Sequence, residues 1–240
     1  MPMKQTVART STYSADVFGA CSALFELGGM IVIHDPSGCN STYTTHDEPR
    51  WYDMDSLLFI SGLTEIDAVI GNDNKLVNDI VKAAQDFSPR FIVILGTPVP
   101  YMTGMDLSAA AGIIEKQIHI PTYFLPTNSM HSYISGASMA FAMLAENIAS
   151  VPVKKHNKSA VNILGMTPLD FSANGSDKAV RQVISRQSFD IASVWAMGST
   201  LDEISKAAVA DVNLVVSADG LETAHIMQQR FGIPYVVGVP

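Results

Sequence analysis

Thiols are scarce in this sequence: Cys21 and Cys39 are the only cysteines among its 240 residues. The first residues lead into a polar stretch rather than an apolar core, so no secretory signal is predicted. Few cysteines without an export signal indicate a reducing, cytoplasmic location, where a disulfide is a poor default.

Long apolar runs and an excess of positive charge are also missing. The richest apolar stretch, residues 134–149, is interrupted by Ser135, Ser138, Glu146 and Asn147, so no membrane span is expected. The net charge is −8 and the pI about 5.1, which argues against a surface that coats nucleic acid. With 48% hydrophobic residues, the chain has ample material for a folded core.

Several catalytic motifs are absent as well. The sequence has no G-x-x-x-x-G-K-[S/T], no G-x-S-x-G elbow, and no G-x-G-x-x-G following a predicted strand. We therefore expect that this chain binds no nucleotide itself and that any nucleotide hydrolysis belongs to a partner.

Alternating strands and helices predict an α/β protein with two Rossmann-like doubly wound domains and mainly parallel sheets. The predicted strands are 30–33, 57–61, 68–70, 91–95, 122–125, 161–164, 191–195, 212–216 and 235–239. The predicted helices are 15–27, 74–87, 105–117, 134–148, 178–186, 201–208 and 221–231. The basic, proline-containing stretch at 151–160 is typical of a linker between domains 1–150 and 161–240. Residues 40–55 lack periodicity and predict an exposed, functional loop.

The chain is organised around one strand and the turn that ends it. The apolar run from Met30 to Ile33 predicts a short buried strand, and His34-Asp35-Pro36-Ser37-Gly38 is turn chemistry that delivers Cys39. Cys21 lies in the helix that leads into this strand. Both thiols therefore belong to one helix–strand–turn unit.

These residues resemble the nitrogenase component 1 family, which includes nitrogenase catalytic subunits, their cofactor-assembly relatives and dark protochlorophyllide reductases. Four features carry the resemblance. They are Cys21 with the turn His34–Cys39, the stretch 63–71 with Lys75 and Leu76, residues 94–98 with 104–106, and residues 161–165 with 231–235. The resemblance implies an oxidoreductase subunit that works with an ATP-dependent, nitrogenase-reductase-like electron donor.

The resemblance also implies a site. An iron–sulfur cluster of the 4Fe-4S type would lie at a subunit interface on Cys21 and Cys39, with His34, Pro36 and Gly38 in the loop that binds it. Such a cluster requires four thiolates, so a homodimer, or a heterodimer with a related subunit, would have to complete the set.

The sequence departs from the family pattern in three places. Residues 97–99 have no thiol where the family has its third cluster cysteine, and residues 215–220 have none where nitrogenase holds its catalytic cluster. The sequence also stops at Pro240, where the family's third domain would begin. Nitrogen reduction is therefore not expected, and we interpret the chain as a short or truncated relative.

Four alternatives remain open from the residues alone. Both cysteines can be small buried hydrophobes, or they can form a disulfide. The chain can also be a non-catalytic binding module for a small molecule or a tetrapyrrole-like metallocofactor, or an inactive fragment of a larger subunit. His34 is a candidate for moving protons, although a histidine at a strand end is more often hydrogen-bonded within the core.

Overall fold

A computed structural model describes residues 15–38, 40–44, 48–150 and 159–240. The strands are β1 (Met30–Ile33), β2 (Leu57–Ile60), β3 (Ile92–Leu95), β4 (Thr122–Leu125), β5 (Ala160–Met166), β6 (Asp190–Ala196), β7 (Val212–Val215) and β8 (Tyr235–Val237). The α-helices are α1 (Asp16–Leu24), α2 (Asn40–Thr42), α3 (Glu65–Ile70), α4 (Asp73–Phe87), α5 (Pro98–Thr103), α6 (Leu107–Ile118), α7 (Tyr133–Asn147), α8 (Pro168–Phe171), α9 (Ser176–Arg186), α10 (Leu201–Ser205) and α11 (Leu221–Phe231). The 3-10 helices are η4 (Pro49–Tyr52), η5 (Ala207–Val209) and η6 (Ala218–Gly220).

The strands form two 4-stranded sheets with the same topology. Their orders are β2-β1-β3-β4 and β6-β5-β7-β8, and each described ladder is parallel. Parallel strands need crossover connections, and helices supply them here. The predicted α/β fold with two doubly wound parallel sheets is therefore confirmed.

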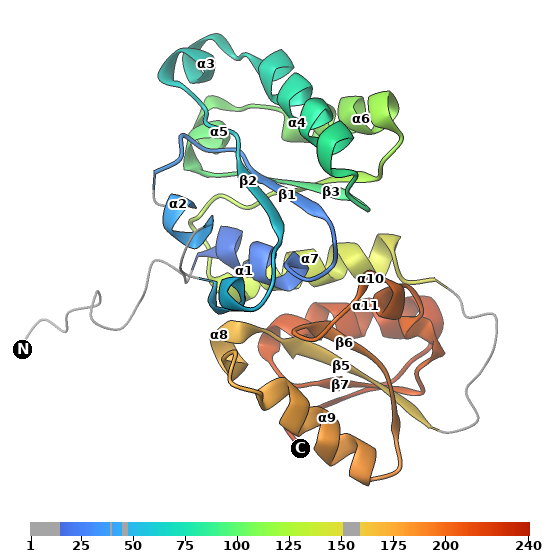
Figure 1. Ribbon diagram of the computed structural model, residues 1–240. Helices are drawn as coiled ribbons and strands as arrows, with labels where there is room; N and C mark the ends of the chain where they lie inside the picture. The colour runs from blue at the N-terminus through green and yellow to red at the C-terminus, as the bar shows by residue number, and fades with distance from the viewer. Residues whose placement is uncertain (1–14, 39, 45–47, 151–158) are drawn as a thin grey trace, which may run out of the picture.

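The elements are stacked in layers (Figure 1). Side chains alternate along each strand: Met30 and Val32 pack with α4 and α6, whereas Ile31 and Ile33 face a core shared with α1 and α7. That second core continues into the other sheet, where it includes Leu164. Helices α1, α7 and α11 therefore lie between the two sheets.

Two glycines allow α1 and α7 to approach closely. A Cβ added at Gly19 would lie 1.9 Å from the carbonyl oxygen of Tyr133, and one at Gly136 would lie 1.7 Å from that of Asp16. Side chains at these positions would therefore force the two helices apart.

One predicted strand is wrong. Residues 68–70 belong to helix α3, not to an extended segment. Thr64 and Asp67 form a capping box at its start, and Gly71 ends it in the left-handed region with φ 75°. These local signals outweigh the short apolar run that suggested a strand.

The predicted exposed loop at 40–55 is wrong in part. Its described portion contains α2 and η4, and the side chains of Tyr43, Glu48 and Arg50 are buried. Helices α5 and α8 were not predicted; each begins with a proline at its first position, where the missing N–H costs no hydrogen bond.

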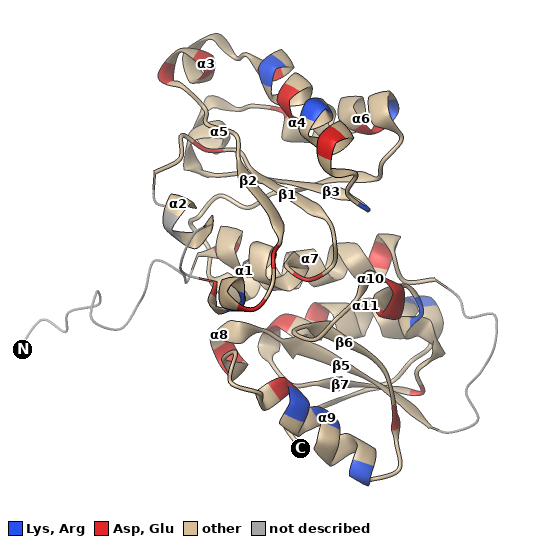
Figure 2. Ribbon diagram, viewed as in Figure 1, with Lys and Arg blue, Asp and Glu red and all other residues tan. Residues whose placement is uncertain are grey.

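No helix in the described part of the chain is both long and apolar enough to cross a membrane. Figure 2 shows acidic and basic residues alternating along α4, whereas α3 carries acidic residues only. The charge of α3 is therefore distinct from that of the helix that follows it.

Candidate functional site

The candidate site is the turn that follows β1. Strand β1 lies between β2 and β3, and the chain leaves β1 toward one neighbour and later returns to the other. In open parallel sheets with this strand order, ligands bind at the carboxyl ends of the strands, where the direction of winding switches. The predicted site residues thus lie at a location suited to binding.

Both neighbouring strands hold the start of this turn. The backbone N–H of His34 donates to the carbonyl of Leu95 at 3.0 Å, and the Thr97 hydroxyl donates to the carbonyl of His34 at 2.8 Å. On the other side, the N–H of Ser61 donates to Ile33 at 3.0 Å. The backbone at the end of β1 is therefore fixed before the turn begins.

The next residues leave this fixed backbone for the surface. The Asp35 carboxylate accepts the N–H of Ser37 at 3.3 Å, and Ser37 adopts a left-handed φ of 84°. Pro36, Ser37 and Gly38 are exposed. The predicted loop residues Pro36 and Gly38 can therefore be reached by a second subunit.

His34 is buried behind the turn, with 3% of its surface exposed. Its Nδ1 lies 2.7 Å from the Ser61 hydroxyl, while Nε2 has no hydrogen-bond partner among the described residues. Burial lowers the pKa of His34 to about 4, against the opposing charge of Asp35. His34 is therefore a neutral imidazole at physiological pH, which suits hydrogen bonding rather than fixed positive charge.

Cys21 lies in the middle of α1 and is completely buried. It shares a hydrophobic core with Val17, Leu24 and Ile31. Burial, and then the negative charge of Glu48, raise the pKa of the Cys21 thiol well above its usual value. A thiol in such surroundings is chemically inert and costly to ionise.

Cys39 lies outside the described residues. The segment after it is well anchored. Tyr43 stacks on Phe18 with ring centroids 4.8 Å apart, and its hydroxyl lies 2.7 Å from that of Ser22. The Trp51 indole donates to the Tyr43 carbonyl at 3.0 Å. The segment that follows Cys39 is therefore fixed to the fold through Tyr43.

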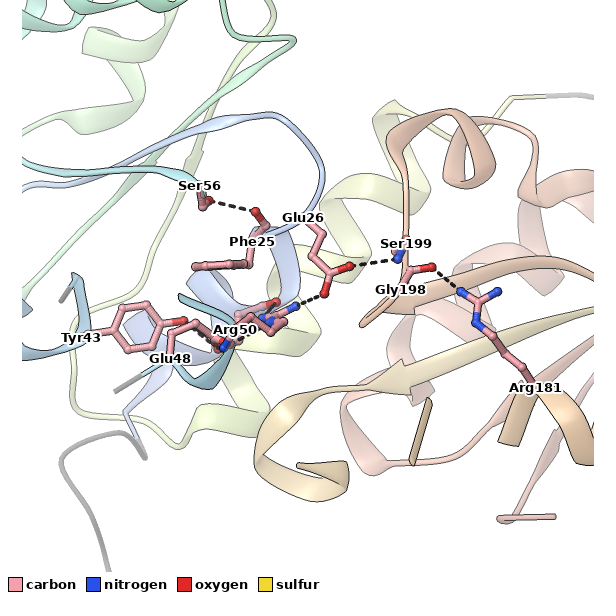
Figure 3. Close-up of polar contacts among 10 residues, drawn as sticks. Phe25, Glu26, Tyr43, Glu48, Arg50, Ser56, Arg181, Gly198 and Ser199 are labelled. Carbon is pink, nitrogen blue, oxygen red and sulfur yellow. Dashed lines mark hydrogen bonds and ion pairs between the residues drawn. The ribbon is translucent and has the colours of Figure 1, made fainter. Parts of the chain in front are cut away.

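A buried ionic network supports this segment (Figure 3). Arg50 pairs with Glu48 at 2.7 Å and with Glu26 at 2.9 Å, and its guanidinium lies 4.7 Å from the centre of the Phe25 ring. Burial alone would raise the pKa of Glu48, but its hydrogen bond and ion pair with Arg50 lower it. Glu48 therefore remains charged in the interior.

The same network reaches the second sheet. The second oxygen of Glu26 accepts the backbone N–H of Ser199 at 3.2 Å, and Arg181 donates to the adjacent carbonyl of Gly198 (Figure 3). A continuous polar path thus joins the segment after Cys39 to the turn that follows β6.

Iron–sulfur clusters are held by cysteine thiolates. In a single chain, the Cys21 thiol is enclosed by the core around α1. The exposed turn that leads to Cys39 fits an interfacial site better. In the described part of the chain, no group of three or more His, Cys, Asp or Glu residues could hold a metal ion. The described residues of one chain therefore do not supply a complete ligand set.

Comparison with known sequences identifies the family. The sequence profile of the Nitrogenase component 1 type Oxidoreductase family matches residues 16–240. This chain belongs to that family. The resemblance inferred from the motifs is therefore confirmed.

Individual relatives are distant. The chain is 24% identical to a nitrogenase molybdenum-iron protein alpha chain from Clostridium pasteurianum, covering 85% of this chain and 40% of that one. It is 26% identical to the iron-molybdenum cofactor biosynthesis protein NifE of Methanosarcina barkeri, covering 85% and 46%. It is 24% identical to a light-independent protochlorophyllide reductase subunit from Leptolyngbya boryana, covering 69% and 34%. The chain thus spans less than half of these relatives.

A solved structure supports the fold. "Nitrogenase Cp1 at pH 5" aligns with a TM-score of 0.77 at 22% identity, covering 93% of this chain and 47% of that one. At this identity the likeness concerns the fold alone. The alignment therefore supports the fold of two parallel sheets covered by helices.

Proposed function

We propose that the chain is a redox subunit of a component 1-type oxidoreductase that shares an iron–sulfur cluster with a second subunit, using Cys39 as its ligand. The observation that carries the proposal is the turn after β1. It lies at the switch point of the first sheet, its start is held by both neighbouring strands, and Pro36 to Gly38 are exposed.

The burial of Cys21 favours a non-identical partner. With Cys39 alone, two copies of this chain would provide two thiolates, fewer than the four that a 4Fe-4S cluster takes. A related subunit with additional cysteines would complete the set, and the matched relatives include a nitrogenase alpha chain and a protochlorophyllide reductase subunit. A cluster bound there would carry electrons from a donor to a substrate.

The electron donor would be an ATP-dependent, nitrogenase-reductase-like protein. Its proposed docking surface lies on α3 and α5, where Val69, Ile70 and Met102 are 82%, 74% and 79% exposed. A cavity of about 430 Å³ lies between these helices. An apolar surface beside acidic Glu65 and Asp67 suits a partner with apolar and basic residues.

The cluster proposal is tested by purification without oxygen and reconstitution with iron and sulfide, alone and with the related subunit. We expect iron and sulfide in the complex and absorbance near ~400 nm from thiolate-ligated iron. A colourless, iron-free complex would contradict the proposal and favour a non-catalytic binding module.

The donor proposal is tested separately. Val69→Glu should abolish co-purification with the donor, because it places a charge in the apolar surface, while iron content stays unchanged. Retained co-purification would show that docking occurs elsewhere.

A further inference from the structure

Two carboxylates converge at the switch point of the second sheet, away from the turn after β1. Sheet order β6-β5-β7-β8 repeats that of the first sheet, so the equivalent position lies between the carboxyl ends of β5 and β7. Asp170 lies on α8, directly after β5, and Asp219 lies on η6, directly after β7. Topology thus brings them together from separate loops.

Oxygen atoms gather around these two carboxylates. The Ser217 hydroxyl donates to Oδ2 of Asp170, and the Thr167 hydroxyl donates to Oδ2 of Asp219 at 3.2 Å. A Cβ added at Gly165 would lie 2.3 Å from Oδ1 of Asp219 and 3.2 Å from the carbonyl oxygen of Ser217. Only glycine leaves room for this arrangement.

One of these oxygens has no partner. Asp219 is 0% exposed, and its Oδ1 has no hydrogen bond among the described residues. The ion pairs formed within the described part of the chain include neither Asp170 nor Asp219. A buried carboxylate oxygen without a hydrogen-bond partner, beside a second carboxylate, is an arrangement that a bound cation would stabilise.

We propose that Asp170 and Asp219 bind a hydrated magnesium ion at the carboxyl ends of β5 and β7. Mg²⁺ takes hard oxygen ligands, keeps several of its waters, and is held by one or two carboxylates. Two carboxylates with hydroxyl and carbonyl oxygens fit that pattern. Zinc sites are built mainly on histidine and cysteine, and the Asp170–Asp219 group contains neither. The proposal does not depend on a cluster at Cys39.

The test uses the full-length protein with Mn²⁺, which is visible by electron paramagnetic resonance, as a probe for the Mg²⁺ site. At pH 8 we expect one Mn²⁺ per chain, displaced by excess Mg²⁺. Asp219→Asn and Asp170→Asn should each raise Kd at least about tenfold, since each removes one of two charged ligands. Asp86→Asn, on the exposed surface of α4, is the matched control and should leave Kd unchanged.

Thermal unfolding gives an independent readout. Mg²⁺ at about 100 times Kd should raise the Tm of the wild type by roughly 5 °C or more, and should not raise that of Asp219→Asn. Asparagine replaces the acid without changing its shape, and Asp170 is exposed, so at least one variant folds. Absence of Mn²⁺ binding by the wild type, or an unchanged Kd in either variant, would overturn the proposal.

Discussion

At the scale of single residues, His34 has the clearest chemical signature of the turn after β1. Its imidazole is buried and neutral, with Nδ1 against Ser61. The pKa of His34 is 6.5 in the unfolded chain, whereas burial lowers this pKa to about 4 in the folded chain. Stability from neutral His34 is therefore complete above pH 6.5 and is lost as the pH falls toward 4.

We expect the free energy of unfolding to fall by about 2 kcal/mol more in the wild type than in His34→Asn between pH 7.5 and pH 5. Urea unfolding at both pH values measures this difference. His225→Asn, at an exposed histidine, should keep the wild-type dependence. Parallel curves for wild type and His34→Asn would refute the assignment of a neutral buried imidazole.

Arg50 is a second residue with a measurable role. Arg50→Met would leave Glu26 and Glu48 buried without their cation, so we expect a loss of roughly 3–5 kcal/mol in urea unfolding. Arg90→Met is the control, because the Arg90–Asp202 pair is exposed and should contribute less than about 1 kcal/mol. Equal losses in the two variants would contradict the network.

Residue-scale features were the least predictable from the sequence. The turn residues His34 to Gly38 were found because strand and turn signals are local. The partners of Arg50 are dispersed, with Glu26 lying 24 positions away, and only the fold brings them together. The same holds for Asp219, whose neighbour Thr167 is 52 positions distant. Burial of Cys21 was one of the alternatives left open by the sequence.

At the scale of elements, the contact between α1 and α7 carries a sharp prediction. Gly136→Ala places a methyl group against the backbone of Asp16, so we expect destabilisation of about 2 kcal/mol or more despite alanine's higher helix propensity. Gly112→Ala, in α6, meets nothing within 4 Å and should stabilise by about 0.5–1 kcal/mol. Chemical denaturation distinguishes the two signs, and stabilisation in both variants would exclude the close contact.

Strands were predicted well because runs rich in Val and Ile lie in parallel sheets buried on both faces. Both β1 and β4 match their predicted bounds. The error at 68–70 arose because a short apolar run is compatible with either a strand or a helix. The capping box from Thr64 to Asp67 was the signal that would have decided for a helix.

At the scale of the whole molecule, one hydrophobic core joins the two sheets. Phe141 on α7 contacts Trp195 on β6, with ring centroids 6.1 Å apart. The division into domains 1–150 and 161–240 stays a prediction. The sequence could not show that one core includes residues of both parts, because these contacts form only in the folded chain. A shared core favours cooperative unfolding of the two sheets.

We expect a single unfolding transition seen by both tryptophans. Trp51→Phe leaves Trp195 to report on the second sheet, and Trp195→Phe leaves Trp51 to report on the first. In urea, the fluorescence midpoints of the two variants should differ only by the effect of each substitution on the free energy of unfolding. Within each variant, the fluorescence midpoint should coincide with the midpoint from far-UV circular dichroism. Fluorescence and circular dichroism midpoints that differ within one variant would show that the sheets unfold independently.

The central claim is that the turn after β1, and not the buried thiol of α1, binds the cluster. Iron per chain in the reconstituted complex, compared between Cys39→Ala and Cys21→Ala, tests it most directly. We predict that Cys39→Ala loses its iron, whereas Cys21→Ala keeps the wild-type amount, because the Cys21 thiol lies within the core. Full iron content in Cys39→Ala, with loss in a folded Cys21→Ala, would contradict the account.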